Sequence, residues 1–184
     1  LLIAVIERSD SARVRILDIG AGPLTSIGTR WPGTKLEIVP VDPLASSYRY
    51  LLAKRRLKPV VETMCCRGES IDRRFAAERF DIAYARDALD HTADPACVLR
   101  NMLDIVSAGG SVVLRHHLRS GLRTRYRGLR QWNFDVHDGE LIVWSPRTMY
   151  NLTGELENRA SVRCEVQQST RDDQQVLALI QPLC

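Results

Sequence analysis

The clearest chemical signal in the chain is a pair of glycines that follows an acid at the end of an apolar run. Residues 15–24 read RILDIGAGPL, which is typical of a buried strand that ends in a tight turn. Glycine adopts backbone conformations that other residues avoid, and it has no Cβ atom to hold a ligand away. Asp18 places a carboxylate beside this turn. A strand, a glycine turn and a following helix together predict a nucleotide-type binding site in an α/β sheet.

The spacing of the glycines separates two kinds of nucleotide. A pyrophosphate site prefers the pattern G-x-G-x-x-G, in which the third glycine lets helix and strand pack closely. Gly20 and Gly22 fit the first two places, but Thr25 occupies the third. Asp18 would repel a pyrophosphate and would favour a cationic group, directly or through water. The sulfonium and the amino group of S-adenosylmethionine (SAM) are such cations.

The same residues resemble motif I of the class I SAM-dependent methyltransferases. That motif has an acid, any residue, Gly, any residue, Gly, any residue and commonly a third Gly, where this chain has Leu24. The resemblance implies that Asp18 and the turn formed by Gly20, Ala21 and Gly22 contact SAM.

Two further acids stand where an adenosine would need them. Asp42 and Pro43 follow the predicted strand 36–41, and a carboxylate at that place can accept hydrogen bonds from both ribose hydroxyls. This chemistry serves SAM and NAD alike, and Asp-Pro is also simply a good turn. Glu69 and Ser70 lie where methyltransferases often present an acid or a polar group to the adenine amino group. Ser70 would serve equally well as a helix cap.

A second segment extends the resemblance. Residues 80–95 read FDIAYARDALDHTADP, similar to the methyltransferase stretch in which a strand leads to a small residue, Arg, Asn, any residue, Leu, Glu, His and then Asp-Pro. Asp87 replaces the Asn and Asp90 replaces the Glu. The resemblance covers about residues 12–116, and it implies that Arg86 and Asp87 also contact the cofactor.

The histidines are the candidates for acid–base catalysis. A sulfonium makes its methyl carbon electrophilic, so the protein mainly aligns the acceptor and excludes water, and only a hydroxyl or amine acceptor needs a base. We expect His91 or His116 to be that base and His117 to contact the substrate. His91 would serve equally well as a brace for its loop. His116 and His117 are adjacent on an extended segment, so one at most points inward.

An aromatic and basic segment follows the fifth predicted strand. Tyr126 and Trp132 would form an aromatic floor for a sugar or another ring, with nearby arginines binding a phosphate or a carboxylate. The run 126–134 is similar to one in bacterial small-molecule methyltransferases of saccharide and secondary-metabolite pathways. The alternative is that the aromatic side chains pack the local hairpin onto the body. The arginines of this segment are Arg115, Arg119, Arg123, Arg125, Arg127 and Arg130.

Composition bounds the kind of protein. The 184 residues are 45% hydrophobic and 26% charged, which fits one globular domain. A net charge of +4 is too small to argue for nucleic acid, and no apolar run reaches the roughly 20 residues of a membrane span. Five cysteines without C-x-x-C spacing predict reduced thiols, a cytoplasmic location and no metal site. Because the chain begins with Leu1, we expect a fragment or a processed chain.

Strand and helix patterns alternate along most of the chain. The tail departs from this alternation, because Asp138-Gly139 predicts a hairpin turn and Ser145-Pro146 predicts a helix start. The predicted strands are 14–19, 36–41, 60–65, 80–85, 111–115, 132–136, 140–144, 161–168 and 174–181, the predicted helices are 25–30, 45–56, 71–78 and 95–106, and a turn is predicted at 108–110.

This order of elements predicts an α/β fold. We expect a Rossmann-like, doubly wound sheet of seven strands, mostly parallel, with an antiparallel hairpin at its C-terminal edge. Class I methyltransferases have this arrangement, so the order of elements supports the motif independently. We expect residues 1–184 to form a single domain with a β-hairpin insertion at about 120–145.

Together, these features predict a SAM-dependent methyltransferase that acts on an O or N atom of a small molecule, saccharide-like or anionic. One alternative is an RNA-directed methyltransferase or a module that binds SAM without turnover, which the arginine cluster favours. Another is an NAD-dependent oxidoreductase, which Thr25 and Asp18 disfavour. We expect neither nucleic acid nor membrane as a partner, and the sequence leaves the oligomeric state open.

Overall fold

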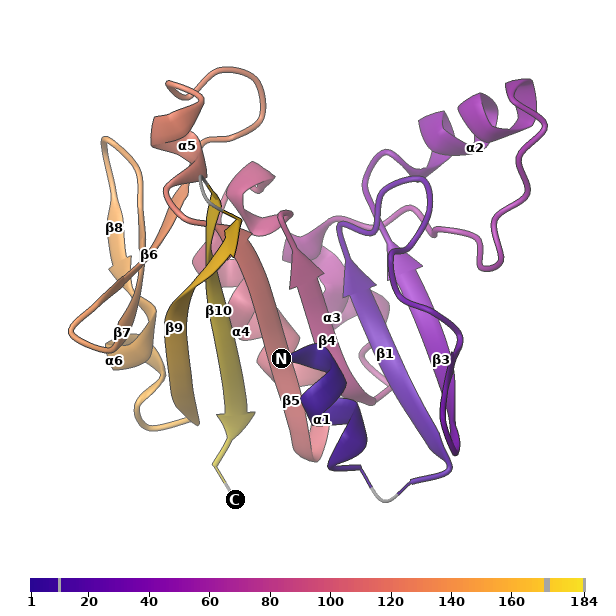
Figure 1. The fold of residues 1–184 in the computed structure, drawn as a ribbon, viewed down its shortest axis with the longest axis horizontal. Helices are drawn as coiled ribbons and strands as arrows, with labels where there is room; N and C mark the ends of the chain where they lie inside the picture. Colours follow the sequence, from indigo (N-terminus) through magenta and orange to yellow (C-terminus); the bar gives the residue numbers. More distant parts are fainter. Residues whose placement is uncertain (10, 171–172, 184) are drawn as a thin grey trace.

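Seven strands of the described chain form one sheet in the order β2-β3-β1-β4-β5-β10-β9 (Figure 1). The computed structural model describes residues 1–9, 11–170 and 173–183. The pairs β3–β1, β1–β4 and β4–β5 are parallel, whereas β10 is antiparallel to both β5 and β9. This confirms the mostly parallel sheet with an antiparallel C-terminal edge. The strands are β1 (Arg13–Ile19), β2 (Arg30–Trp31), β3 (Thr34–Val41), β4 (Phe80–Arg86), β5 (Val106–His117), β9 (Ala160–Thr170) and β10 (Asp173–Pro182).

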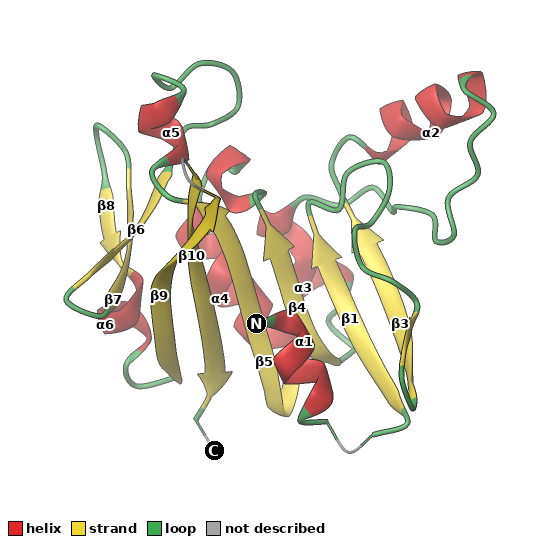
Figure 2. Ribbon diagram, in the orientation of Figure 1, coloured by secondary structure: helices red, strands yellow, loops and turns green. Residues whose placement is uncertain are grey.

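Helices lie on both faces of this sheet (Figure 2). On one face α4 buries Leu99 and Met102 in the larger core, and its first turn is capped by Asp94, whose carboxylate accepts from the Cys97 amide. On the other face α1 buries Ile6 against the second core cluster. The helices are α1 (Leu2–Glu7), α2 (Ala45–Lys54), α3 (Ile71–Arg74), α4 (Pro95–Ile105), α5 (Ser120–Arg123) and α6 (Leu152–Leu156), with short 3₁₀ turns at Gly68–Ser70 and Leu89–His91.

Alternation along each central strand supplies both cores. In β4, Ala83 and Ala85 belong to the core beneath α4, whereas Ile82 and Tyr84 belong to the core beneath α1. This is the two-residue period of a strand that is covered on both faces. Because β3, β1, β4 and β5 are parallel, their carboxyl ends share one edge of the sheet, where most of the predicted site residues lie.

The predicted strand 60–65 does not form. Met64 alone bridges to Val41, and the side chain of Val60 is 86% exposed. Within the described chain, the outer edge of β3 is instead paired with β2 at Thr34 and Lys35 and with Met64 at Val41. The predicted helix 25–30 is also wrong, because its last residue belongs to β2 and the rest is irregular.

The tail contains a small second sheet made of β6 (Asn133–His137), β7 (Glu140–Trp144) and β8 (Met149–Asn151). The predicted hairpin turn is confirmed, since Asp138 and Gly139 both have positive φ angles, 51° and 81°, as a type I′ turn requires. The helix predicted from Ser145 is wrong. The Ser145 amide instead donates to the carbonyl of Thr148 at 2.7 Å and closes a turn into β8.

Two smaller differences concern the extents of elements. The predicted helix 71–78 is only the short α3. The turn predicted at 108–110 lies inside β5, where the pairing with β4 shifts register between Phe80 and Ile82. Of the described helices, none is long and apolar enough to cross a membrane.

Candidate active site

The glycine turn after β1 is held against two neighbouring strand ends. The amides of Gly20 and Ala21 both donate to the carbonyl of Val41 at the end of β3, at 2.8 and 3.1 Å. Gly20 has a φ of 71°, and a Cβ atom at this position would lie 2.3 Å from the Cβ of Ala88 in the loop after β4. Glycine at position 20 therefore lets the ends of β1, β3 and β4 meet.

Asp42 fixes the rest of the turn. Its buried carboxylate accepts from the Gly22 amide at 3.1 Å and from the Leu44 amide at 2.8 Å. The hydroxyl of Thr63 donates to the carbonyl of Gly22 at 2.9 Å from the other side. Each carboxylate oxygen has a second lone pair, so Asp42 keeps acceptor capacity for a ligand hydroxyl. The adjoining Pro43 is exposed.

Asp18 is a buried acid with a raised pKa. Its side chain is 3% exposed, and burial raises its pKa from 3.8 to about 6, helped by the negative charge of Asp42 and opposed by a hydrogen bond from Thr25. That hydrogen bond is 2.6 Å long and reaches Oδ2. Among the described residues, no basic side chain forms an ion pair with Asp18. The turn therefore contains a carboxylate that a cationic ligand group would stabilise in its ionised form.

The predicted adenine-side residues lie at the start of α3. Glu69 accepts from the amide of Ala93 at 2.9 Å and so joins its loop to the loop after β4. Ser70 occupies the N-cap position of α3, but its side chain makes no capping hydrogen bond there. The Ser70 hydroxyl therefore does not cap α3, which was the alternative role predicted for this residue.

The loop after β4 is fixed to the end of β5 through Asp87. Asp87 has a positive φ of 48°, and its Oδ1 accepts from the His117 amide at 3.0 Å. Its Oδ2 lies 3.7 Å from both Arg86 Nε and His117 Nε2. Positive φ is rare for a residue with a side chain, and here it directs the carboxylate toward the edge of the sheet.

The structure separates the three histidines that the sequence offers as catalytic or substrate-binding residues. His116 is 1% exposed and stacks on Phe134 with ring centroids 4.0 Å apart, and burial lowers its pKa to about 4. A ring enclosed in this way cannot take a proton from a ligand, so the structure argues against a catalytic His116. His91 lies at the surface, with Nε2 3.7 Å from Asp90 Oδ2.

His117 is the histidine that the fold places at the sheet edge with a partner. Its side chain is 27% exposed, and Nδ1 lies 2.8 Å from Asp173 Oδ1. The same oxygen accepts from Arg123 Nη1 at 2.9 Å. Hydrogen bonds from Arg123 and His117 lower the pKa of Asp173, so its carboxylate stays ionised. This Asp–His–Arg group orients the imidazole and leaves Nε2 on the side of Asp87.

Asp173 was not predicted from the sequence, where it lies 56 positions from His117. The pairing of β10 with β5 brings the two together, with Gln175 opposite His117. The signal that could have found it was the predicted antiparallel hairpin, because an edge strand that returns beside the fifth strand must begin near His117.

The two aromatic residues of the predicted floor differ in their surroundings, Trp132 being buried and Tyr126 half-buried. Trp132 is 8% exposed, and its indole N–H donates to the carbonyl of Thr92 at 3.0 Å. Tyr126 accepts from the amide group of Asn133 at 3.0 Å through its hydroxyl. The Trp132 contact fixes the segment before β6 to the loop after β4, as the packing alternative expects, whereas the Tyr126 contact joins this segment to β6 itself.

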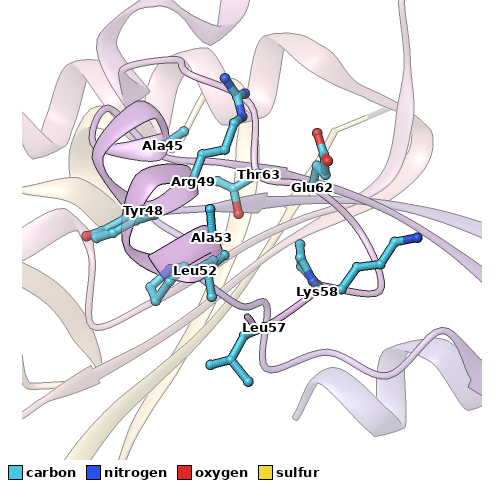
Figure 3. A pocket seen from close by; sticks show the side chains of 11 residues that line it. Ala45, Tyr48, Arg49, Leu52, Ala53, Leu57, Lys58, Glu62 and Thr63 are labelled. Carbon is cyan, nitrogen blue, oxygen red and sulfur yellow. The ribbon is translucent and has the colours of Figure 1, made fainter. Parts of the chain in front are cut away.

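A small cavity lies beside the glycine turn, between α2 and residues 57–63 (Figure 3). Its volume is about 190 Å³, and Thr63 and Tyr48 lie on its wall. Sites that enclose a whole small molecule measure roughly 300–1,000 Å³, so this cavity can take only part of a ligand.

Within the described chain, no cluster of three or more His, Cys, Asp or Glu side chains could hold a metal ion.

A family profile described as "Methyltransferase domain" matches residues 2–156. The chain belongs to this methyltransferase family. The matched range contains the glycine turn, Asp42 and the loop after β4. No curated protein matches the chain.

Solved structures of methyltransferases share the fold. A SAM-dependent methyltransferase from Clostridium acetobutylicum is 11% identical with a TM-score of 0.58, over 98% of this chain and 88% of that one. The N-methyltransferase NodS from Bradyrhizobium japonicum, in complex with S-adenosylhomocysteine (SAH), is 15% identical with a TM-score of 0.53, over 92% and 78%. At such identities the likeness concerns the fold.

Alanine at the two glycines should separate backbone strain from steric overlap. Both residues have φ near 70°, so each substitution costs roughly 1 kcal/mol in backbone conformation. Gly20→Ala also creates the overlap with Ala88, whereas nothing lies within 4 Å of a Cβ at position 22. We expect Gly20→Ala to lower the free energy of unfolding by about 1–3 kcal/mol more than Gly22→Ala, measured by urea denaturation. Ala88→Gly should restore most of that difference, and equal losses at both glycines would contradict the packing.

The raised pKa of Asp18 should make stability fall with rising pH. Between about pH 4 and pH 6 the folded protein holds a proton that the unfolded chain releases, so the free energy of unfolding decreases across this window. The change from 3.8 to about 6 corresponds to roughly 3 kcal/mol by pH 7. Asp18→Asn cannot ionise and should remove the decline in urea unfolding series, whereas Asp138→Asn in the exposed turn should retain it. The same pH slope in wild type and Asp18→Asn would refute the shift.

Proposed function

We propose that this protein transfers a methyl group from SAM to an O or N atom of a small molecule. The observation that carries the proposal is the buried carboxylate of Asp18 beside a glycine turn, which has no ion-pair partner among the described residues, in a chain of a methyltransferase family. A buried charge without an opposite charge is costly, and a cationic methyl donor supplies that positive charge. When bound, SAM supplies a methyl carbon made electrophilic by the sulfonium.

The cofactor would be held by residues from four neighbouring segments. Asp18 faces its cationic end, and the backbone of Gly20, Ala21 and Gly22 lies against it without side chains in the way. Asp42 accepts from the ribose hydroxyls with its remaining lone pairs. The remaining proposed contacts are Pro43, Glu69 and Ser70 on the adenine side and Arg86 and Asp87 on the methyl side.

For an acceptor hydroxyl or amine, we propose His117 as the base. Asp173 accepts from Nδ1 and fixes the tautomer in which Nε2 can take a proton. Arg123 keeps Asp173 ionised and in place. Proton removal by a positioned imidazole contributes typically 10²–10⁴-fold to such a reaction. His117, assigned to the substrate from the sequence, therefore takes the role first given to His91 and His116.

Two observations disfavour the alternative functions. The hydroxyl of Thr25, at the place of the third glycine of a pyrophosphate site, donates to Asp18, which keeps an acid where an NAD pyrophosphate would lie. Arg119 and Arg123 are paired with Asp135 and Asp173, which reduces the charge available to an RNA backbone.

We further propose that the chain acts as a single domain, with the hairpin at about 120–145 as an insertion beside the site.

Loss of the Asp42 carboxylate should weaken cofactor binding. In calorimetric titrations we expect wild type to bind SAM and SAH and not NADH. Asp42→Ala should weaken binding of both by at least tenfold, about 1.4 kcal/mol, because the ribose loses its acceptor and the turn loses two tethers. Asp42→Asn, which keeps one acceptor oxygen, should be intermediate, with folding checked by circular dichroism. Wild-type affinity in Asp42→Ala would contradict the proposed site.

Removal of the His117 imidazole should slow the chemical step and leave the affinity for the cofactor unchanged. With an acceptor found by screening hydroxyl and amine compounds for SAH formation, we expect His117→Gln to lower kcat about 100-fold without changing SAM affinity. Asp173→Asn should lower kcat less, because it removes the orienting group and keeps the base. His91→Gln is the matched control and should stay near wild type. Unchanged kcat in His117→Gln would overturn the assignment.

A further inference from the structure

The helix α1 covers only part of one face of the sheet (Figure 1). A second hollow is lined by residues of α1 and of the strands β2, β3, β4, β5 and β10. Its volume is about 450 Å³, within the range of roughly 300–1,000 Å³ that small-molecule sites occupy. Apolar side chains from α1, β3, β5 and β10 form most of its wall, together with Trp31 of β2. They include Ile6, Leu36, Val113 and Leu177.

All charged side chains in the wall of the hollow are basic. Arg30, Arg86 and Arg115 line the hollow, and none of its lining residues is acidic. Arg115 donates through Nε to the neutral side chain of Gln175 at 2.6 Å. Arg86 has Asp87 as its ion-pair partner, at the longer distance of 3.7 Å. Of the three arginines, only Arg86 has an ion pair with a carboxylate within the described chain.

The sheet places two of these arginines side by side. Arg86 at the end of β4 and Arg115 in β5 are direct partners in the parallel pairing, and both line the hollow. Like charges at adjacent sheet positions repel each other. An anion between the two guanidinium groups removes this repulsion and forms charge-assisted, often bidentate hydrogen bonds.

We propose that this hollow is a binding site for an amphipathic anion. The ligand has a carboxylate, sulfonate or phosphate head held by Arg86 and Arg115, and an apolar ring or short chain that lies against Trp31 and the aliphatic wall. The apolar body accounts for the lining, and the anionic head accounts for the paired arginines. The hollow adjoins the proposed cofactor site, because Arg86 is also among the proposed cofactor contacts and Tyr84 of its wall pairs with Asp18 in the sheet. The proposal shares Arg86 with the proposed function, but probe binding is measured without SAM and does not depend on the identity of the methyl donor.

Two fluorescent probes with similar ring systems test the proposal. The probe 8-anilinonaphthalene-1-sulfonate carries an anionic head, and N-phenyl-1-naphthylamine lacks it. We expect the double variant Arg86→Met, Arg115→Met to bind the sulfonate at least tenfold more weakly and the neutral probe within twofold of wild type. The matched control Arg125→Met, Arg127→Met, whose arginines do not line the hollow, should bind both probes like wild type.

The position of the probe is tested independently by energy transfer. Trp31 lines the hollow, whereas Trp132 and Trp144 do not, so Trp31→Phe should remove most of the tryptophan-sensitised emission of the bound sulfonate. Circular dichroism confirms that each variant is folded. Sulfonate affinity within twofold of wild type in the double arginine variant, an equal loss for both probes, or unchanged energy transfer in Trp31→Phe would each overturn the proposal.

Discussion

The carboxylate of Asp42 is the contact on which the candidate site depends. It holds the amide of Gly22 in the turn after β1 and the amide of Leu44 at the start of α2. Because Asp42 directly follows β3, one side chain connects the ends of two strands and the beginning of a helix. Buried carboxylates that accept backbone hydrogen bonds are well satisfied, so the glycine turn keeps its shape before any ligand arrives.

Two acids with different environments lie at the carboxyl ends of β1 and β3. Asp42 is satisfied by amides, whereas Asp18 is buried with one hydroxyl donor and without an ion-pair partner in the part of the chain that the structure describes. Burial and the neighbouring charge push Asp18 toward its neutral form, and a cationic ligand would reverse this. These environments support the proposal of a positively charged ligand beside an adenosine, which accords with the methyltransferase family of the chain.

The sequence was sufficient for the central strands and the glycine turn, because apolar runs and glycine spacing report local constraints. It failed for residues 60–65, because β-propensity does not report whether a segment pairs with its neighbouring strand along its length, and only Met64 bridges to β3 here. The burial of His116 against Phe134 and the pairing of His117 with Asp173 arise from contacts between distant segments. Such contacts follow from strand order and register, which residue patterns only outline.

The most direct test of the account is the number of protons released when SAM binds. Calorimetric titrations near pH 6 in two buffers of different ionisation enthalpy measure it. Since the pKa of Asp18 is about 6, a cation bound beside it should release roughly half a proton per SAM in wild type. The release should be near zero in Asp18→Asn. Failure of SAM to bind, or equal release from both proteins, would contradict a cofactor site at this turn.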